Sequence, residues 1–339
     1  MSTSITTRVH ALAGAIACAA VLSGCDRDAG KPAGSSAAAP AAAPDAAATP
    51  ASSAPATAPL RVVATNLPLA LFAGAIGGDA VRVELPVPEE TDPADWSPSA
   101  EAVAAMQGAD LILCNGAGDE KWLATAALPR SRTLDTSAPI AASLITLPEA
   151  VTHSHGPGGA HTHSGTATGT WLDFDLAAKQ AEAVGARLEA LRPADAAAMR
   201  QRTQALVARL HALAQRSAAV GAALAGAPVI ASHPVYDYLA RRAGLSLRSV
   251  HWEPGDEPSA ADWQAFDTLR AAHPARVMLW EGEPTKGARD QLLQRGITVV
   301  VFFPGPNAPE QQRTLDAWCS QMEASLSALQ AAAAPKPGG

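Results

Sequence analysis

Four of the nine histidines in this chain of 339 residues lie within eleven residues, in a stretch without hydrophobic periodicity. They are His153, His155, His161 and His163. Each pair is spaced i, i+2, so in an extended segment both imidazoles of a pair point to the same side and could bind one ion. Neutral imidazole suits zinc, copper, nickel or iron better than calcium or magnesium. The alternative is a solvated Gly/Ser/Thr loop whose histidines bind nothing.

A second group of candidate ligands lies at the ends of predicted strands. The apolar runs that predict these strands are residues 227–232, 245–250 and 276–280. They are followed directly by His233, His251 and Glu281. In an open parallel α/β sheet the ligand site lies outside the carboxyl ends of the strands, so these side chains should lie close together. His161 or His163 could then complete a four-coordinate site. A hydrogen-bonded turn is the alternative for each strand-end residue.

The candidate ligands need a scaffold of parallel strands, and the sequence pattern predicts one. Apolar runs alternate with helical patterns in both halves of the chain, which is typical of parallel β–α–β units. Between the halves, an apolar stripe that ends at Arg192-Pro193 predicts a long connecting helix. We therefore expect an α/β fold with two lobes, each with a small parallel sheet flanked by helices, bridged by a long rigid helix. In the first half the predicted strands are residues 60–66, 81–87 and 110–114, and the predicted helices are residues 69–76 and 100–106.

The N-terminus predicts an anchor in a membrane. Arg8 precedes the apolar stretch Ala11–Leu22, which is too short to span a bilayer and ends in Leu22-Ser-Gly-Cys25. This pattern resembles a bacterial lipoprotein signal peptide, in which Cys25 becomes the lipidated first residue of the mature protein. Asp26 resembles the signal that retains such lipoproteins in the inner membrane of Gram-negative bacteria. The predicted location is therefore the periplasmic side of that membrane.

Composition and pattern divide the chain into segments. The stretch after Cys25 has almost no bulky apolar side chains, so it cannot bury enough surface to fold. The segments are a signal peptide (1–25), a disordered Ala/Pro-rich tether (26–59), an N-terminal α/β lobe (60–150), a His-rich loop (151–170), a connecting helix (171–193), a C-terminal α/β lobe (194–330) and a disordered tail (331–339).

Charge and motif content exclude several functions. The formal net charge is −7, with 25 Lys and Arg against 32 Asp and Glu, which argues against a nucleic-acid partner. Four scattered cysteines are too few for a disulfide framework. The sequence contains no His-Glu-x-x-His helix and no Gly-x-Ser-x-Gly elbow, so a binding protein is favoured over a hydrolase.

Several motifs in order carry a family likeness over residues 60 to about 329. The chain resembles the zinc and manganese substrate-binding lipoproteins of ABC importers, the ZnuA/TroA-like family. The resemblance implies a metal in the cleft between two lobes and delivery to a membrane permease. We also expect the protein to be a monomer. The motifs are Asn115-Gly-Ala-Gly after a strand, Trp171-Leu172-Asp173 before a helix, Ser232-His233 with Tyr236 and Tyr238, Glu253-Pro254 with Glu257-Pro258-Ser259, and the His-rich segment ahead of Trp171.

The chain departs from the family at the usual metal ligands. Ala94 follows Asp92-Pro93 where the family has a histidine, and Gly169-Thr170 stands where a second histidine precedes Trp-Leu-Asp. The acidic position near the last strand falls at about Phe303-Pro304. Only His233 matches a ligand position of the family. We therefore expect a site rebuilt from neighbouring residues, with His161, His163, His251 and Glu281 beside His233, and with His153, His155 and Glu283 as accessory ligands.

These observations predict a periplasmic lipoprotein that captures a divalent transition metal and passes it to an ABC importer. Zinc is the expected ion, with manganese or another divalent transition metal as the alternative. A metal-buffering or chaperone lipoprotein remains an alternative, as does the same fold binding a non-metal solute.

Overall fold

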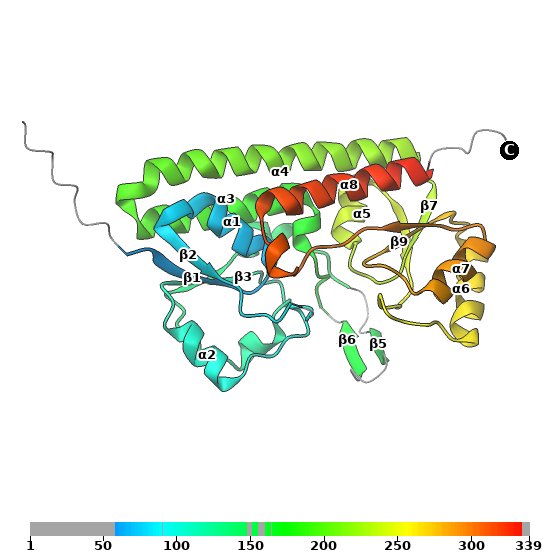
Figure 1. The fold of residues 1–339 in the computed structure, drawn as a ribbon, viewed down its shortest axis with the longest axis horizontal. Helices are drawn as coiled ribbons and strands as arrows, with labels where there is room; N and C mark the ends of the chain where they lie inside the picture. Colours follow the sequence, from blue (N-terminus) through cyan, green and yellow to red (C-terminus); the bar gives the residue numbers. More distant parts are fainter. Residues whose placement is uncertain (1–57, 90, 148–150, 155–159, 164, 334–339) are drawn as a thin grey trace, which may run out of the picture. The chain divides into compact units, whose positions relative to one another are not determined.

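The computed structural model describes residues 58–89, 91–147, 151–154, 160–163 and 165–333. The predicted signal peptide with Cys25, the predicted tether up to residue 57, and His155 lie outside these residues. The described chain contains two four-stranded parallel sheets with helices around them (Figure 1), which confirms the predicted fold class.

The first sheet has the strand order β2-β1-β3-β4, and every neighbouring pair is parallel. Strand β3 is buried at all four positions, as expected for an apolar strand covered on both faces. Helix α1 starts where the Asn66 side chain accepts a hydrogen bond from the backbone of Leu69. The elements are β1 (Leu60–Ala64), α1 (Leu67–Gly77), β2 (Val81–Glu84), α2 (Ala100–Gln107), β3 (Leu111–Cys114) and β4 (Thr133–Asp135).

The second sheet repeats this plan with the strand order β10-β9-β7-β8, again parallel throughout. Its central strand β9 is also buried at every position. The strands after which we predicted ligands are therefore all present, and their carboxyl ends meet at one edge. The elements are β7 (Pro228–Ala231), α5 (Asp237–Ala243), β8 (Ser246–Ser249), α6 (Ala260–Ala272), β9 (Val277–Trp280), α7 (Lys286–Gln294) and β10 (Thr298–Val301).

Two long helices lie between the sheets in sequence, α3 (Phe174–Leu191) and α4 (Ala196–Leu224). Helix α3 packs against α1 and α4, while α4 contacts both α1 of the first lobe and α5 of the second. The C-terminal helix α8 (Leu315–Ala333) lies beside α4 (Figure 1). Helix α4 is thus a long helix that bridges the two lobes.

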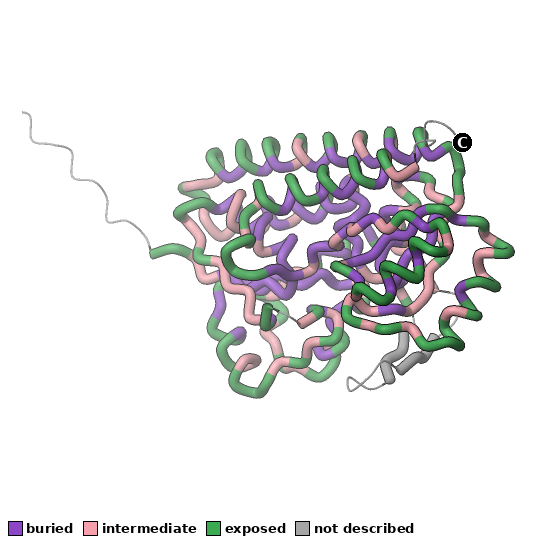
Figure 2. The backbone as a smooth tube through the Cα atoms, turned by 45° about the vertical axis from the view of Figure 1, so that its right-hand side comes forward, coloured by how far each residue is buried: buried purple, intermediate pink, exposed green. Residues whose placement is uncertain are grey.

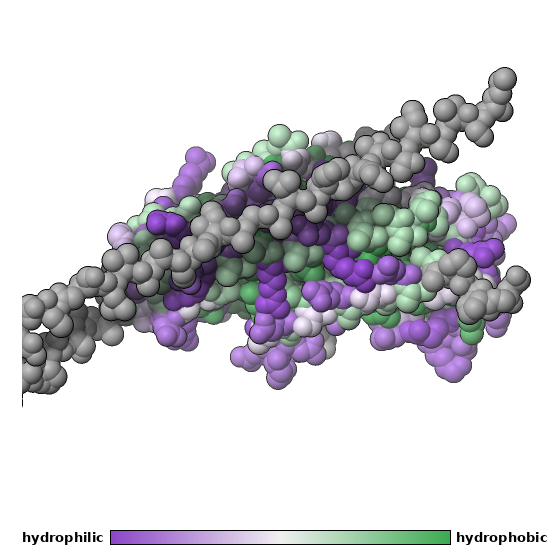
Figure 3. Space-filling view, turned by 90° about the horizontal axis from the view of Figure 1, so that it is seen from above, coloured by the Kyte–Doolittle hydropathy of each residue, from purple (hydrophilic) through white to green (hydrophobic). Residues whose placement is uncertain are grey.

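One hydrophobic core runs through both lobes and the long helices. It includes Val62 and Phe72 of the first lobe, Leu210 of α4, and Val229 and Phe302 of the second lobe. The buried residues follow the inner sides of these helices (Figure 2), and hydrophilic side chains protrude from the face shown in Figure 3. The lobes and the long helices thus share buried apolar contacts. Within the described residues, no helix combines the length and the apolar character needed to cross a membrane.

The close contact between α4 and α5 gives a test of this packing. A Cβ atom added to Gly221 would lie 1.6 Å from the carbonyl oxygen of Ala243, so Gly221→Ala must push the two helices apart. We expect this change to lower the free energy of unfolding by about 1–3 kcal/mol, as overpacked sites do. Gly74 in α1 is the matched control, because its added Cβ meets only a methyl group at 4.0 Å.

Thermal unfolding of both variants measures the difference. Gly74→Ala should leave the melting temperature unchanged or raise it, since alanine is the better helix former by about 1 kcal/mol. Equal melting temperatures for the Gly221→Ala variant and the native protein would contradict the close packing of α4 on α5.

Candidate metal centre

Three metal-competent side chains converge at the carboxyl end of the second sheet. His233 follows β7, Glu281 follows β9, and Glu253 lies on the chain after β8. His233 Nε2 lies 3.5 Å from Glu253 Oε1, and His233 Nδ1 lies 3.6 Å from Glu281 Oε1. One ligand atom from each residue lies within 4.8 Å of the others. In the described parts of the chain, this is the one group of at least three such residues that could hold an ion.

The ends of the strands place these residues by backbone hydrogen bonds. The amide of Ser232, just before His233, donates to the carbonyl of Leu279 on β9 at 2.8 Å. The carbonyl of Ser232 accepts from the amide of Trp252 at 2.6 Å, beside Glu253. These bonds tie the ends of β7, β8 and β9 together. The position of the cluster therefore follows from the sheet.

Burial makes the charges of this cluster costly. His233 is 6% exposed and Glu281 is 9% exposed, while Glu253 is partly exposed. Burial raises the pKa of Glu281 well above its usual value, and the nearby charges of Glu253 and Asp92 raise it further. Carboxylates held this close in a protein interior favour sharing a proton or binding a cation. The cluster is thus suited to a divalent metal.

The first lobe adds acidic groups near the cluster. Part of the Asp92 surface is exposed to solvent, but the surrounding protein desolvates its carboxyl group. This desolvation, with the charges of Asp95 and Glu253, raises the pKa of Asp92 to about 6. Asp119 is 4% exposed. Its burial is the main cause of a pKa well above the usual value, and the charges of Glu120 and Asp92 raise that pKa further. The charge of Asp92 in the first lobe thus contributes to the raised pKa of Glu281 in the second.

The turn after β3 places Asp119 in the first lobe. Gly116, Ala117 and Gly118 have φ angles of 77°, 57° and 86°, so three consecutive residues are left-handed. The Glu120 carboxylate stabilises this turn by accepting hydrogen bonds from the amides of Asn115 at 2.6 Å and Gly116 at 3.0 Å. The Asn115-Gly-Ala-Gly motif thus forms a tight turn after β3.

The predicted ligands occupy different places in the structure. His233 and Glu281 lie together, and the ring of His251 packs edge-on to that of His233 with centroids 6.2 Å apart. His251 also lines a groove of about 490 Å³ with Asp256 and Glu257. Glu283, the predicted accessory ligand, instead forms an exposed ion pair with Arg289.

The His-rich segment contains a short antiparallel hairpin of β5 (Val151–Ser154) and β6 (Ala160–His163). Its register places His153 opposite His161. His161 and His163 both belong to β6, and His155 lies outside the described residues. The role of these histidines as ligands stays a prediction.

One of the usual ligand positions of the resembled family is closed in this chain. Gly169 has a φ angle of 77°, and a Cβ atom there would lie 2.9 Å from the carbonyl oxygen of Val235, so a histidine does not fit. The neighbouring Thr170 hydroxyl contacts Asn115 Oδ1 at 2.9 Å in a buried polar network. At the family's acidic position, about Phe303-Pro304, the carbonyl of Pro304 accepts a hydrogen bond from the Trp171 indole at 2.8 Å.

Glu253 is the member of the cluster that sequence reasoning did not propose as a ligand. Glu253 lies two residues beyond His251, so it is passed over when only the first polar residue after each strand is considered. A search of the whole loop after each strand would have included it.

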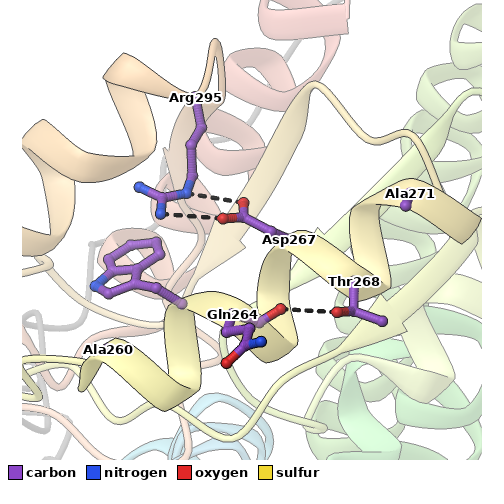
Figure 4. A pocket seen from close by; sticks show the side chains of 7 residues that line it. Ala260, Gln264, Asp267, Thr268, Ala271 and Arg295 are labelled. Carbon is purple, nitrogen blue, oxygen red and sulfur yellow. Dashed lines mark hydrogen bonds and ion pairs between the residues drawn. The ribbon is translucent and has the colours of Figure 1, made fainter.

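A separate groove along the outside of α6 has a different character (Figure 4). It has a volume of about 710 Å³, and its acidic residue, Asp267, is paired with Arg295 at 2.9 Å. The Arg295 guanidinium also lies 4.4 Å above the ring of Trp263. The charges of Asp267 and Arg295 in this groove therefore compensate each other. The cluster at His233 remains the candidate metal centre.

The chain folds into two lobes, each with a parallel sheet, and a long helix joins them. A histidine and two carboxylates meet at the strand ends of one lobe. This architecture is that of a two-lobed binding protein with a candidate metal site. The family model of ZnuA, the periplasmic component A of the zinc-uptake complex, matches residues 62–332. The chain therefore belongs to the ZnuA family, as its motifs predicted.

Curated relatives agree with this assignment. The zinc-binding lipoprotein AdcA of Streptococcus pneumoniae serotype 4 is 25% identical over 281 residues, which cover 80% of this chain and 55% of the relative. The chain thus spans about half the length of that lipoprotein. The high-affinity zinc uptake system protein ZnuA of Bacillus subtilis is 25% identical over 276 residues, which cover 80% of this chain and 86% of the relative.

Solved structures share the fold. The metal-dependent lipoprotein YcdH of Bacillus subtilis superposes with a TM-score of 0.67 at 23% identity, covering 80% of this chain and 99% of that one. The Zn(II)-bound ZnuA-like domain of AdcA from Streptococcus pneumoniae also gives a TM-score of 0.67 at 23% identity, covering 80% and 98%. At this identity the likeness establishes the architecture of the two lobes.

The raised pKa of Glu281 predicts how the metal-free protein responds to pH. The folded protein holds this proton more tightly than the unfolded chain, in which the pKa is near 4.5, so the free energy of unfolding falls as the pH rises above that value. Glu281→Gln removes this cost without changing the shape of the side chain. We expect the variant to melt at a higher temperature than the native protein at about pH 7.5, with the difference shrinking toward about pH 5.

Thermal unfolding in the presence of a chelator, at both pH values, makes the comparison. Lys286 and Asp290 form an exposed ion pair on α7, so Asp290→Asn is a control whose effect should be small at either pH. If the difference in melting temperature between Glu281→Gln and the native protein is the same at both pH values, Glu281 is not a buried carboxylate with a raised pKa.

Proposed function

We propose that this chain captures zinc in the cleft between its lobes and delivers it to an ABC importer. The observation that carries the proposal is the convergence of His233, Glu253 and Glu281 at the strand ends of a ZnuA-family fold. Relatives named as zinc-binding and zinc-uptake proteins support zinc as the cargo.

The spacing of the cluster suits a single small ion. Zinc–ligand bonds are about 2.0–2.2 Å, so two ligands on one tetrahedral zinc lie roughly 3.3 Å apart. The nitrogen–oxygen distances of 3.5 and 3.6 Å around His233 are close to this value. The nearest ring nitrogen is Nε2 for Glu253 and Nδ1 for Glu281, and one ligand atom from each of the three residues lies within 4.8 Å of the others, close enough for a single ion.

The donor types favour zinc among the available divalent ions. An imidazole nitrogen with carboxylate oxygens is a common set for zinc, and such sites bind zinc more tightly than manganese. Ligands must lose their protons before they bind the metal, so zinc binding releases protons from the cluster.

We extend the proposal to the setting of the protein. Cys25 is the lipidated residue, the protein acts as a monomer on the periplasmic side of the inner membrane, and its partner is the membrane permease of the importer. The resemblance of residues 1–25 to a lipoprotein signal peptide and the names of the lipoprotein relatives support this setting. No catalytic role is proposed, since the family consists of transport components.

Substitution of the histidine tests the site. Without the imidazole, His233→Ala should weaken zinc binding by about 100-fold or more, because the change removes a ligand and leaves two carboxylates uncompensated. Isothermal titration against a competing chelator measures the affinity. His211→Ala is the control, because His211 lies exposed on α4 beside Asp175. Unchanged zinc affinity in His233→Ala would place the main site elsewhere.

Growth separates uptake from buffering. A strain that lacks this gene should stop growing when a chelator withdraws zinc, and added zinc or the native gene should restore growth. The gene encoding His233→Ala should fail to restore it. Normal growth of the deletion strain under chelation would instead favour a zinc-buffering lipoprotein.

A further inference from the structure

Four arginines lie around the amino ends of the strands of the first sheet. Because this sheet is parallel, the segments that enter its strands share one edge, opposite the edge at which the Asn115 turn follows β3. Arg132 stands directly before β4, Arg187 and Arg192 lie at the end of α3, and Arg202 lies near the start of α4. These four residues are called the arginine edge below.

Hydrogen bonds place two of these arginines at the entries to β2 and β3. Arg202 donates to the carbonyl of Ile76 at 2.7 Å, at the end of α1 and ahead of β2. Arg132 donates to the carbonyl of Ala109 at 3.2 Å, just ahead of β3. Both arginines are exposed. Their guanidinium groups are thus held at this edge and remain open to solvent.

The other two arginines lie at the entries to β1 and β4. Arg187 donates to the carbonyl of Ser131, ahead of β4, and Arg192 donates to the carbonyl of Ala58, ahead of β1. Ala58 is the first residue that the structure describes, and β1 begins near the turn between α3 and α4 (Figure 1). The chain that comes from Cys25 therefore enters the folded body at the arginine edge.

The positive charge of the arginine edge is not cancelled by these bonds. In each of them the acceptor is an uncharged main-chain carbonyl, and a guanidinium has five N–H donors, so further donors are left for an anion. Nearby, Arg200 pairs with Glu189 at 2.6 Å. The other carboxylates on the strand entries and the α3–α4 turn are fewer than the four arginines and the exposed Arg130; they are Asp79, Asp110 and Asp195. This edge therefore carries an excess of positive charge on a chain whose net charge is −7.

The proposed lipid anchor keeps the arginine edge near a membrane. Residues 26–57 join Cys25 to Ala58, so a body anchored at Cys25 stays within about 110 Å of the bilayer, at about 3.4 Å per residue. A second contact with the same membrane is then intramolecular, so a weak surface suffices. An anionic lipid surface attracts each nearby arginine by a factor of about 5 in affinity, within a Debye length of about 8 Å.

We propose that the arginine edge docks on anionic phospholipid headgroups of the membrane that holds the lipid anchor, and so orients the folded body on that membrane. This inference rests on the proposed lipidation of Cys25. The guanidinium groups bind headgroup phosphates, for which their planar set of donors is well suited. Docking at the amino ends of the first sheet leaves the loops at its carboxyl ends free.

Fluorescence quenching of the lipidated protein on vesicles tests the inference. A dye on Ser131→Cys reports on the arginine edge, and a dye on Ala272→Cys, exposed at the end of α6, is the control. Cys114 and Cys319 are buried, so they do not compete for the dye. With a quencher on the lipid headgroups, the Ser131 dye should be quenched on vesicles of equal parts phosphatidylglycerol and phosphatidylcholine, and far less on phosphatidylcholine alone. High salt should abolish the difference, while the Ala272 dye should show none.

Matched double variants test whether charge is the cause. Arg132→Gln/Arg202→Gln should lower the docking constant on anionic vesicles by roughly 20-fold, because two charges are lost. Arg132→Lys/Arg202→Lys keeps both charges and should dock within about 3-fold of the native protein. Arg248→Gln/Arg276→Gln removes two exposed arginines of the second lobe and should dock normally. A lysine variant that keeps the native zinc affinity but docks as poorly as the glutamine variant would overturn the inference.

Failure of the docking edge and failure of the anchor give different results. If the protein leaves the vesicles and mass spectrometry finds Cys25 unmodified, the proposed anchor fails, and this inference fails with it. If the protein stays on the vesicles but the Ser131 dye is quenched equally on anionic and neutral lipid, the anchor stands and the docking edge does not. Quenching that appears only when the importer permease is present in the vesicles assigns the edge to that protein and also overturns the inference.

Discussion

Electrostatic repulsion among carboxylates around one histidine is the constraint on which the centre of this molecule depends. Glu253 lies nearest Nε2 of the His233 ring and Glu281 nearest Nδ1, and the charges of Glu253 and Asp92 raise the pKa of Glu281 beyond the effect of burial. Burial strengthens each interaction because solvent no longer screens it. The arrangement persists because the sheet ends hold these groups in place, and a divalent ion is the group that would satisfy all of them at once.

Holding such charges together requires a stiff scaffold. Helix α4 bridges the lobes, and close contacts at Gly185 and Gly221 leave no room for a Cβ atom between neighbouring segments. The chain after β10 is bonded to the first lobe, because the amide of Leu67 donates to the carbonyl of Pro306 at 2.8 Å. Near it, the carbonyl of Pro304 accepts a hydrogen bond from Trp171. These ties keep the acidic loops of both lobes at fixed positions.

Periodicity and strand order were sufficient to predict the two parallel sheets, and the strand-end rule predicted that His233 and Glu281 meet. The rest of the site depends on distances that no local pattern records. Glu253 reaches His233 only because of the path of the chain after β8, and the closed position at Gly169 follows from its positive φ angle and the carbonyl of Val235. The departures at Ala94 and Gly169 were visible in the sequence, but their structural consequence was not.

The central claim is that one zinc ion binds at His233 between the two lobes. An anomalous-difference map at the zinc edge, from crystals of the zinc-loaded protein, locates the ion without any assumption about its ligands. A strong peak is expected within bonding distance of His233, with oxygen ligands from Glu281 or Glu253. A fully occupied peak confined to the histidines of the β5–β6 hairpin, with no density at His233, would contradict it.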